Sequence, residues 1–181
     1  MNKNLIALVT GANAGLGFAT AKKFCDNGIT TYVNGRNKEK TLQACEELGP
    51  NAKPFILDLN NLDEIPEAVA KLAEEAGKID ILVNNAGINM KKEFLEVTND
   101  EFQNILHTNV LALFAVSREV AKVMKKNNYG SIIRRISAKP LDRRMALTIS
   151  KFSRSRRECM PSMSSCIEYL LVLLSEAIVI S

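Results

Sequence analysis

Histidine is nearly absent from the sequence. The chain has 181 residues but a single histidine, His107, which excludes a site with several histidines and argues against serine–histidine catalysis. Its cysteines, Cys25, Cys45, Cys159 and Cys166, lack the spacing of metal ligands. We expect them to be free thiols that pack as small apolar side chains, and we predict no metal site.

Long apolar runs are also missing. The run after Lys3 is short and is broken by Thr10 and Gly11, so it does not read as a signal peptide. The apolar stretch 169–180 is too short to span a bilayer and contains Glu176. We therefore expect a cytoplasmic protein with no membrane partner.

Positive charge is unevenly distributed along the chain. The formal net charge is +4, yet the first 133 residues carry 15 basic and 16 acidic side chains, whereas residues 134–181 carry nine and four. The basic stretch 134–157 has one aromatic residue, Phe152, and no recognisable docking motif. This pattern favours a solvated segment over a nucleic-acid patch, so we expect no nucleic-acid partner.

Strand and helix patterns alternate through the first 133 residues. Apolar or β-branched runs predict strands at 5–9, 30–33, 54–57, 79–83 and 131–133, with helices at 15–27, 38–48, 62–76 and 98–125. A capping box of Thr98 and Glu101 opens the last helix. Such βαβ units predict an α/β fold, a Rossmann-type doubly wound parallel sheet whose ligands bind beyond the carboxyl ends of the strands.

Two motifs follow predicted strands. The first, at 10–17, reads Thr-Gly-Ala-Asn-Ala-Gly-Leu-Gly and opens a helix. Its glycines allow a tight turn and a close approach to a pyrophosphate, which the helix N-terminus attracts. A purely structural turn is the alternative, but the strand–turn–helix context favours cofactor binding. The second, Asn-Asn-Ala-Gly at 84–87, can hold neighbouring strand ends, although alone it would read as a polar turn.

Together these motifs resemble the short-chain dehydrogenase/reductase family. Within it, the chain is most similar to the branch of 3-oxoacyl-[acyl-carrier-protein] reductases and gluconate 5-dehydrogenases. Further matches are Asp58-Leu59 after the third predicted strand and Asn109-Val110 in the long helix, and the resemblance covers residues 1–133. It implies an NAD(P)(H)-dependent oxidoreductase acting on a small-molecule ketone or secondary alcohol.

The resemblance also implies roles for individual residues. Gly11, Gly15 and Gly17 would line the pyrophosphate, Asp58 would contact the adenine end, and Asn85 and Gly87 would lie against the nicotinamide-side ribose. The full set of implied cofactor contacts in these motifs is Thr10, Gly11, Asn13, Gly15, Leu16, Gly17, Asp58, Leu59, Asn85, Ala86 and Gly87. Asn109 would be the helix-bending member of the catalytic group and would anchor a water for proton relay; a tolerated polar helix residue is the alternative.

Charge at the end of the second strand bears on the choice of cofactor. NAD enzymes of this fold place an acid there to bind the ribose 2′-OH. Here residues 34–37 read Asn-Gly-Arg-Asn, so the acid is absent and Arg36 offers a cationic fork suited to a 2′-phosphate. The sequence therefore favours NADP(H) over NAD(H), with a solvated loop arginine as the alternative.

The sequence departs from the catalytic pattern of the family at one position, the tyrosine. The family uses a serine together with Tyr-x-x-x-Lys, in which the lysine lowers the pKa of the tyrosine from about 10. Ungapped extension from the strand at 131 places the serine at Ser137, and Lys151 is the matching lysine. Four residues before Lys151 stands Leu147, which has no titratable proton. A cofactor-binding pseudoenzyme or an inactive truncated product is therefore the alternative function.

Residues 134–181 read as a divergent or frame-shifted tail of the domain formed by residues 1–133. This part is rich in arginine, serine and methionine, and no family-like loop follows a sixth strand. We expect the C-terminal edge of the sheet to be incomplete. Members of the family pair through the helix that starts here at Thr98 and the helix that carries Tyr-x-x-x-Lys. A homo-oligomer is thus a possibility that the altered tail argues against.

Overall fold

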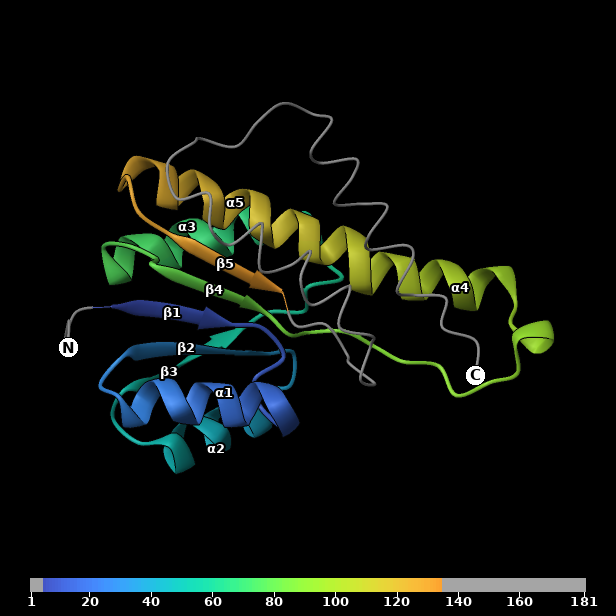
Figure 1. The fold of residues 1–181 in the computed structure, drawn as a ribbon, viewed down its shortest axis with the longest axis horizontal. Helices are drawn as coiled ribbons and strands as arrows, with labels where there is room; N and C mark the ends of the chain where they lie inside the picture. The colour runs from blue at the N-terminus through green and yellow to red at the C-terminus, as the bar shows by residue number, and fades with distance from the viewer. Residues whose placement is uncertain (1–4, 135–181) are drawn as a thin grey trace, which may run out of the picture. The chain divides into compact units, whose positions relative to one another are not determined.

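The computed structural model describes residues 5–134, whose centre is a parallel sheet (Figure 1). Its strands are β1 (Ile6–Val9), β2 (Thr30–Gly35), β3 (Ala52–Ile56), β4 (Ile81–Asn84) and β5 (Ser131–Arg134). They are ordered β3-β2-β1-β4-β5, and every neighbouring pair is parallel. The predicted doubly wound fold is confirmed, while the prediction about the C-terminal edge of the sheet concerns residues outside those described.

Helices cover both faces of the sheet (Figure 1). On one face lie α1 (Gly15–Asp26) and α2 (Lys38–Leu48), and on the other lie α3 (Ile65–Ala76) and α5 (Leu113–Lys126). The chain reaches α5 through a short 3-10 helix, η1 (Phe94–Glu96), then α4 (Asn99–Leu106) and a π-helical segment, η2 (His107–Ala112). None of the helices within the described part is long and apolar enough to cross a membrane.

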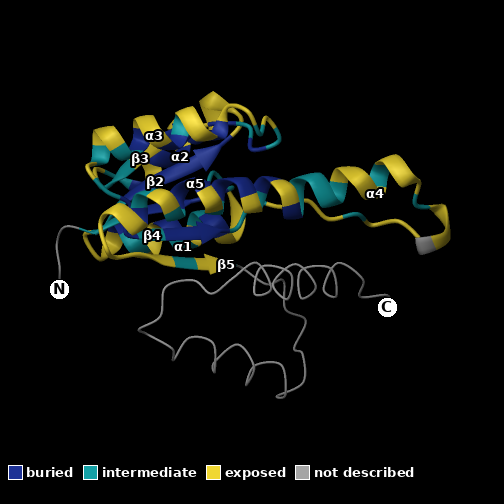
Figure 2. Ribbon diagram, turned by 90° about the horizontal axis from the view of Figure 1, so that it is seen from above, coloured by how far each residue is buried: buried dark blue, intermediate teal, exposed yellow. Residues whose placement is uncertain are grey.

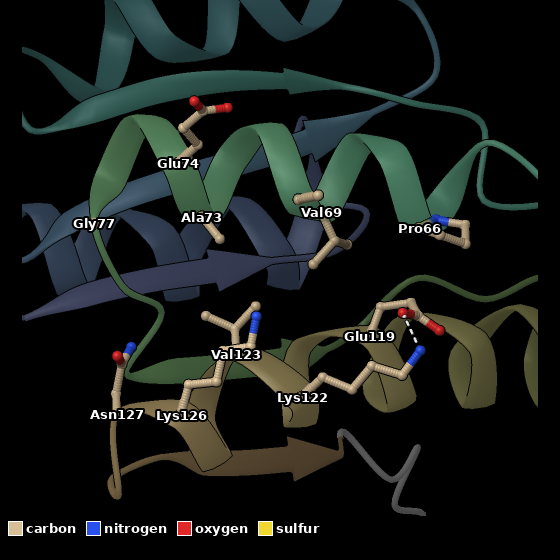
Figure 3. A pocket seen from close by; sticks show the side chains of 11 residues that line it. Pro66, Val69, Ala73, Glu74, Gly77, Glu119, Lys122, Val123, Lys126 and Asn127 are labelled. Carbon is tan, nitrogen blue, oxygen red and sulfur yellow. Dashed lines mark hydrogen bonds and ion pairs between the residues drawn. The ribbon is translucent and has the colours of Figure 1, made fainter.

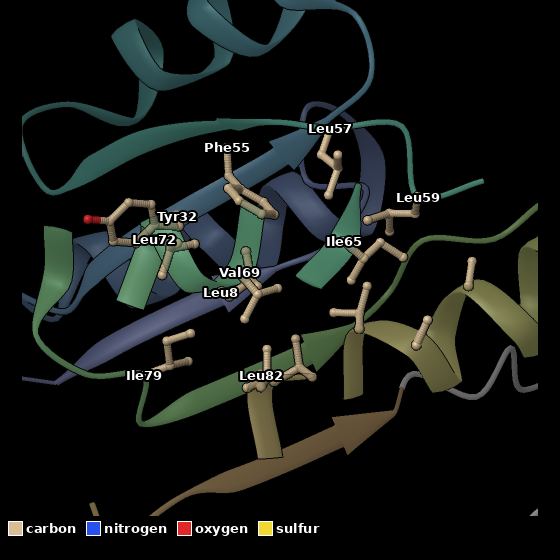
Figure 4. Packing of buried hydrophobic residues seen from close by; sticks show 14 of the residues in the cluster. Leu8, Tyr32, Phe55, Leu57, Leu59, Ile65, Val69, Leu72, Ile79 and Leu82 are labelled. Atoms are coloured by element: carbon tan, nitrogen blue, oxygen red, sulfur yellow. The ribbon is translucent and has the colours of Figure 1, made fainter. Parts of the chain in front are cut away.

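Alternating side chains of the strands divide the apolar core between the two faces. Leu8 and Leu82 belong to the cluster under α3 and α5, shown in Figure 4, whereas Val9 and Val83 belong to the cluster under α1 and α2. This division follows from the two-residue period of a strand. Figure 2 shows that the central strands are buried between helices with exposed outer faces, whereas the edge strand β5 is largely exposed. Burial on both faces explains why the central strands read as continuous apolar runs.

Several predicted boundaries shift by a few residues. The helix at 38–48 has the predicted bounds, but β3 covers 52–56 instead of 54–57 because its pairing with β2 begins at Thr31 and Ala52. The next helix starts at Ile65, not at residue 62, because the preceding residues form turns, with the Asn61 amide donating to the Asp58 carbonyl. β4 covers 81–84 instead of 79–83.

The predicted long helix is continuous, but it has an unpredicted π-helical segment in its middle. The capping box at its start is confirmed, since the Glu101 amide donates to Thr98 Oγ1 at 3.3 Å and Glu101 Oε2 accepts from the Thr98 amide at 2.8 Å. The last strand extends one residue beyond the predicted 131–133, because Arg134 pairs with Asn84 in β5. The described residues lie in a compact unit that ends at Arg135, and the division at residue 133 stays a prediction.

Candidate functional site

The carboxyl ends of β1 and β4 meet where the strand order reverses, and ligands of doubly wound sheets bind at this edge. Both predicted motifs lie here. The Oγ1 atom of buried Thr10 accepts the amides of Asn85 and Ala86, each at 2.9 Å. The side-chain amide of Asn85 donates in return to the carbonyls of Thr10, at 3.0 Å, and Gly11, at 2.9 Å. The two motifs therefore form one structural unit.

Close packing explains two of the predicted glycines. Gly11 has a φ of +58°, and a Cβ atom there would lie 2.9 Å from the Cα atom of Ala86. A Cβ atom at Gly17 would collide with the Asn85 amide and the Gly11 carbonyl oxygen. Gly15 also has a positive φ, +60°, but faces open space. Side chains are thus excluded where the turn contacts the loop after β4.

The start of α1 supplies the electrostatics of this edge. Its N-cap, Ala14, has no side-chain oxygen and makes no capping hydrogen bond, and α1, described in full, has no acid in its first turn. The first amides of a helix lack intrahelical acceptors and carry the positive end of the dipole. Leu16 is 57% exposed beside them, so the turn is open to solvent. This arrangement suits an anionic group.

Asn34 links the glycine turn to the end of β3, a role that the sequence interpretation missed. It is 2% exposed, and its Oδ1 atom accepts the Gly11 amide at 3.2 Å. Its Nδ2 atom donates to the carbonyls of Phe55 and Leu57, both at 3.1 Å. The available signal was an asparagine directly after the β-branched and aromatic run of this strand. It could have been used only with knowledge of which strands are neighbours.

Arg36 is exposed immediately after β2, at the same edge of the sheet. The next residue, Asn37, is occupied as the N-cap of α2, where its side chain accepts the Lys40 amide at 2.8 Å. Asn13, from the first motif, packs against Gly35. The segment after β2 thus presents a cation beside the glycine turn and no acid at positions 34–37.

The loop after β3 brings Asp58 and Leu59 to this edge. Asp58 Oδ1 accepts the backbone amide of Asn60 at 3.0 Å, which closes a local turn. Leu59 is buried in the core under α3 and α5. This hydrogen bond fixes the Asp58 carboxylate relative to the backbone of the loop after β3.

Asn109 lies in the π-helical segment and grips the loop after β4. Its Oδ1 atom accepts the Ile88 amide at 2.8 Å, and its Nδ2 atom donates to the Ile88 carbonyl at 2.9 Å. A Cβ atom at Gly87 would approach the Asn109 side chain to 3.1 Å. Asn109 thus positions the loop at 84–88, and its role in proton relay stays a prediction. Nearby, Asn84 donates to Ser117 Oγ at 2.9 Å, a contact not predicted.

Two predicted catalytic residues, Ser137 and Lys151, lie outside the described residues. Within residues 5–134 no group of three or more histidine, cysteine, aspartate or glutamate side chains is placed to hold a metal ion.

A hollow of about 380 Å³ lies between α3 and α5, away from the predicted site residues (Figure 3). Glu119 borders it and accepts hydrogen bonds from Lys122 at 2.7 Å and Arg118 at 2.8 Å. These two cations lower the pKa of Glu119. None of the predicted cofactor or catalytic residues within 5–134 lines this hollow, so it is an interhelical surface separate from their site.

Comparison with known sequences places this geometry in a family. Residues 5–149 match the model of the short chain dehydrogenase family. The chain is 40% identical over 138 residues to 3alpha-hydroxysteroid dehydrogenase of Mediterraneibacter gnavus, covering 74% of this chain and 55% of the relative. It is 34% identical over 128 residues to 3-oxoacyl-[acyl-carrier-protein] reductase of Vibrio harveyi, covering 71% and 52%. The chain thus spans about half the length of these relatives.

Solved structures agree with the sequence comparison. A putative gluconate dehydrogenase from Agrobacterium tumefaciens superposes with a TM-score of 0.68 at 36% identity, covering 72% of this chain and 53% of the other. A variant of actinorhodin polyketide ketoreductase, solved with NADPH, gives a TM-score of 0.69 at 29% identity, covering 74% and 53%. Because the family model matches well over half of the residues, the chain belongs to the short-chain dehydrogenase/reductase family of oxidoreductases, in the branch of the oxoacyl reductases and gluconate dehydrogenases.

Proposed function

We propose that this chain binds NADP(H) at the carboxyl edge of the sheet and acts on a ketone or secondary alcohol. The observation that carries the proposal is the glycine turn. Thr10 and Asn85 fix it against the loop after β4. A Cβ atom at Gly11 or Gly17 would collide with that loop, so the close approach requires glycine. The uncapped start of α1 follows directly, as a pyrophosphate site requires.

The surroundings of the turn fit the rest of such a nucleotide. In this proposal Gly15, Leu16 and Asn13 border the phosphates, and Asp58 and Leu59 flank the adenine. Asn85, Ala86 and Gly87 border the nicotinamide-side ribose, as they do in the family pattern. These groups come from the ends of neighbouring strands, so one extended ligand can reach all of them.

Preference for the 2′-phosphate rests on Arg36. It is exposed at the end of β2, where a selective NAD site would carry an acid. A guanidinium forms two parallel hydrogen bonds with a phosphate, which a ribose hydroxyl cannot match. A family member solved with NADPH supports the same choice.

The cofactor would supply or accept the hydride, and the chain would position the substrate. Asn109 holds the loop beside the nicotinamide end. Ser137 would orient the carbonyl oxygen and Lys151 would hold the ribose, as the family pattern implies. Relatives named as a hydroxysteroid dehydrogenase and an oxoacyl reductase support a ketone or secondary alcohol as substrate.

A second function, cofactor binding without turnover, is favoured by one specific observation. Leu147 occupies the position where the family places its tyrosine. A leucine side chain neither donates nor accepts a proton, so the usual general acid is missing. A cofactor-binding pseudoenzyme would keep the glycine turn, which needs only the first half of the domain. An inactive truncated product would likewise have leucine in place of the tyrosine.

The cellular setting that we propose is the cytoplasm. The described cysteines, Cys25 and Cys45, are free and buried, which fits a reducing compartment. Fractionation of cells that express the chain would test this, and recovery in a membrane or secreted fraction would contradict it. Light scattering of the purified chain would measure whether it forms a homo-oligomer.

Fluorescence titration of the purified chain with NADPH and with NADH tests the cofactor proposal. Losing a charge-assisted pair with the 2′-phosphate costs about 1.5–3 kcal/mol, or about 10- to 100-fold in Kd. We expect Arg36→Ala to weaken NADPH binding by this amount and to change NADH binding less than about threefold. Lys71→Ala, which removes an exposed cation from α3, is the matched control and should leave both affinities unchanged.

The outcomes separate the two functions. Binding with ketone-dependent oxidation of NADPH in the same cuvette supports the oxidoreductase and requires a proton donor other than a tyrosine at position 147. Binding without turnover supports the pseudoenzyme. If the wild-type chain bound neither nucleotide, both functions would be refuted.

A further inference from the structure

The loop after β3 is fixed from a second side, by the π-helical segment η2. The Nε2 atom of His107 lies 3.0 Å from the backbone carbonyl oxygen of Asn60. A carbonyl oxygen only accepts, so this ring nitrogen carries the proton. The Thr108 hydroxyl donates to the side-chain oxygen of Asn60 at 2.9 Å. Two adjacent residues of η2 thus hold one residue of a loop that is 47 and 48 positions away in the sequence.

Asn60 connects η2 to the residues that border the adenine in our proposal. Its backbone amide donates to the Asp58 carboxylate at 3.0 Å, and Asn61 donates to the Asp58 carbonyl at 3.0 Å. Leu59, between them, is buried. The position of the Asp58 carboxylate therefore depends on where Asn60 is held.

The same turn of helix also holds the loop after β4. Asn109, next to Thr108, makes two hydrogen bonds with Ile88. His107, Thr108 and Asn109 are the first three residues of η2, and π-helical turns inside longer helices are frequent at functional sites. Three successive side chains therefore connect the loops on either side of the sheet centre.

We propose that His107 and Thr108 are positioning residues for the adenine end of the nucleotide. They fix the loop that carries Asp58 and Leu59 through Asn60. This inference rests on the proposed nucleotide site. Its physical basis is preorganisation: a loop held in place before binding loses less conformational freedom when the ligand arrives. The nicotinamide side is held separately, through Asn109.

Substitution at position 108 gives a nearly isosteric test. Thr108→Val keeps the shape and removes the hydroxyl, whereas Thr108→Ser keeps the hydroxyl and serves as the matched control. One neutral hydrogen bond is worth a factor of about 2 to 10 in an equilibrium. We expect Thr108→Val to raise hydrogen exchange of the amides at 58–61 by this factor in the nucleotide-free protein. Thr108→Ser should exchange as the wild type does.

Binding of nucleotide fragments supplies the second readout. Adenosine 2′,5′-bisphosphate represents the adenine half and nicotinamide mononucleotide the other half. Thr108→Val should weaken the first by about 2- to 10-fold and leave the second unchanged. Asn60→Ala should give a similar loss, and the double variant should lose little more, because both changes remove the same bond.

Three results would overturn the assignment. If Thr108→Val kept the wild-type hydrogen exchange at 58–61 and the wild-type affinity for the adenine fragment, the Thr108–Asn60 bond would not position the loop. Equal weakening of both fragments would indicate general loosening of the fold. Failure of the wild-type chain to bind any nucleotide would refute the proposed function and this assignment together, whereas wild-type binding with an unaffected Thr108→Val variant refutes the assignment alone.

Discussion

At the scale of single residues, the site depends both on glycines that lack a Cβ atom and on side chains that form hydrogen bonds. Gly11 and Gly17 lie where any Cβ atom would meet the loop after β4, so their role is to allow contact. Thr10 and Asn85 supply the hydrogen bonds across that contact. Adding a Cβ atom at one of these glycines and removing one of these hydrogen bonds should therefore lower the free energy of unfolding separately.

Gly11→Ala is expected to destabilise the fold by about 2–4 kcal/mol. The left-handed backbone costs alanine about 1 kcal/mol, and overpacking against Ala86 adds about 1–3 kcal/mol. Gly28→Ala is the matched control, because Gly28 has a φ of +75° but faces open space and should cost about 1 kcal/mol. Urea unfolding measures both, and equal losses would show that the contact with Ala86 imposes no strain.

Asn34→Asp tests the bridge between the glycine turn and β3. Aspartate keeps the shape but loses both donors, and it turns a negative charge toward the Phe55 and Leu57 carbonyls in a buried position. We expect a loss of about 3 kcal/mol or more in unfolding free energy. Asn37→Asp, at an exposed N-cap where aspartate is equally favourable, should change it by less than about 0.5 kcal/mol. Similar values for the two variants would contradict the bridging role.

At the scale of elements, local signals were sufficient for some boundaries and insufficient for others. The helix at 38–48 was predicted with its observed bounds because Gly49, with its positive φ, ends it. The π-helical segment was not predicted, since its contacts with Asn60 and Ile88 come from loops that are far away in the sequence. β5 includes Arg134 because β4 pairs with it, which an arginine in the sequence does not reveal.

The candidate site divides in the same way. The glycine turn and the motif at 84–87 are contiguous and were visible in the sequence. The Asn34 bridge and the grip of Thr108 on Asn60 require knowledge of strand order and helix placement. Polar residues that join two elements but lie outside such motifs, like Asn34 and Thr108, are thus what sequence patterns miss, because each half of the contact is unremarkable alone.

On α5, Glu119 should make stability depend on acid pH. Its hydrogen bonds with Lys122 and Arg118 lower its folded-state pKa, so its contribution is present above its unfolded pKa of about 4.3 and is lost as pH falls through the lower folded value. We expect Glu119→Gln to lose about 1 kcal/mol at pH 7 and to flatten the stability profile below pH 4.5. Circular dichroism with urea at several pH values measures this.

Glu67→Gln on α3 is the control for that experiment. Glu67 also pairs with a lysine, but both partners are about three-quarters exposed, so its removal should be nearly silent. An equal effect of the two substitutions would mean that the burial of Glu119 beside the α3–α5 hollow has no energetic weight.

At the scale of the whole described unit, two apolar layers share one sheet. Leu82 faces the layer under α3 and α5, and its neighbour Val83 faces the layer under α1 and α2. Since the backbone hydrogen bonds of β4 serve both layers, neither can open far without disturbing the other. The unit should therefore unfold in one cooperative step.

Cys45 reports on this cooperativity from the α1–α2 layer. Burial raises the pKa of its thiol to about 11, so at pH 8 the folded protein holds it protonated and covered, and alkylation requires opening. Leu82→Ala, in the opposite layer, should cost about 3 kcal/mol and speed the labelling of Cys45 about 100-fold. Peptide-resolved mass spectrometry measures the rate, and labelling in urea normalises it. If Val83→Ala accelerated labelling while Leu82→Ala did not, the α1–α2 layer would open by itself, and the shared sheet would not couple the two cores.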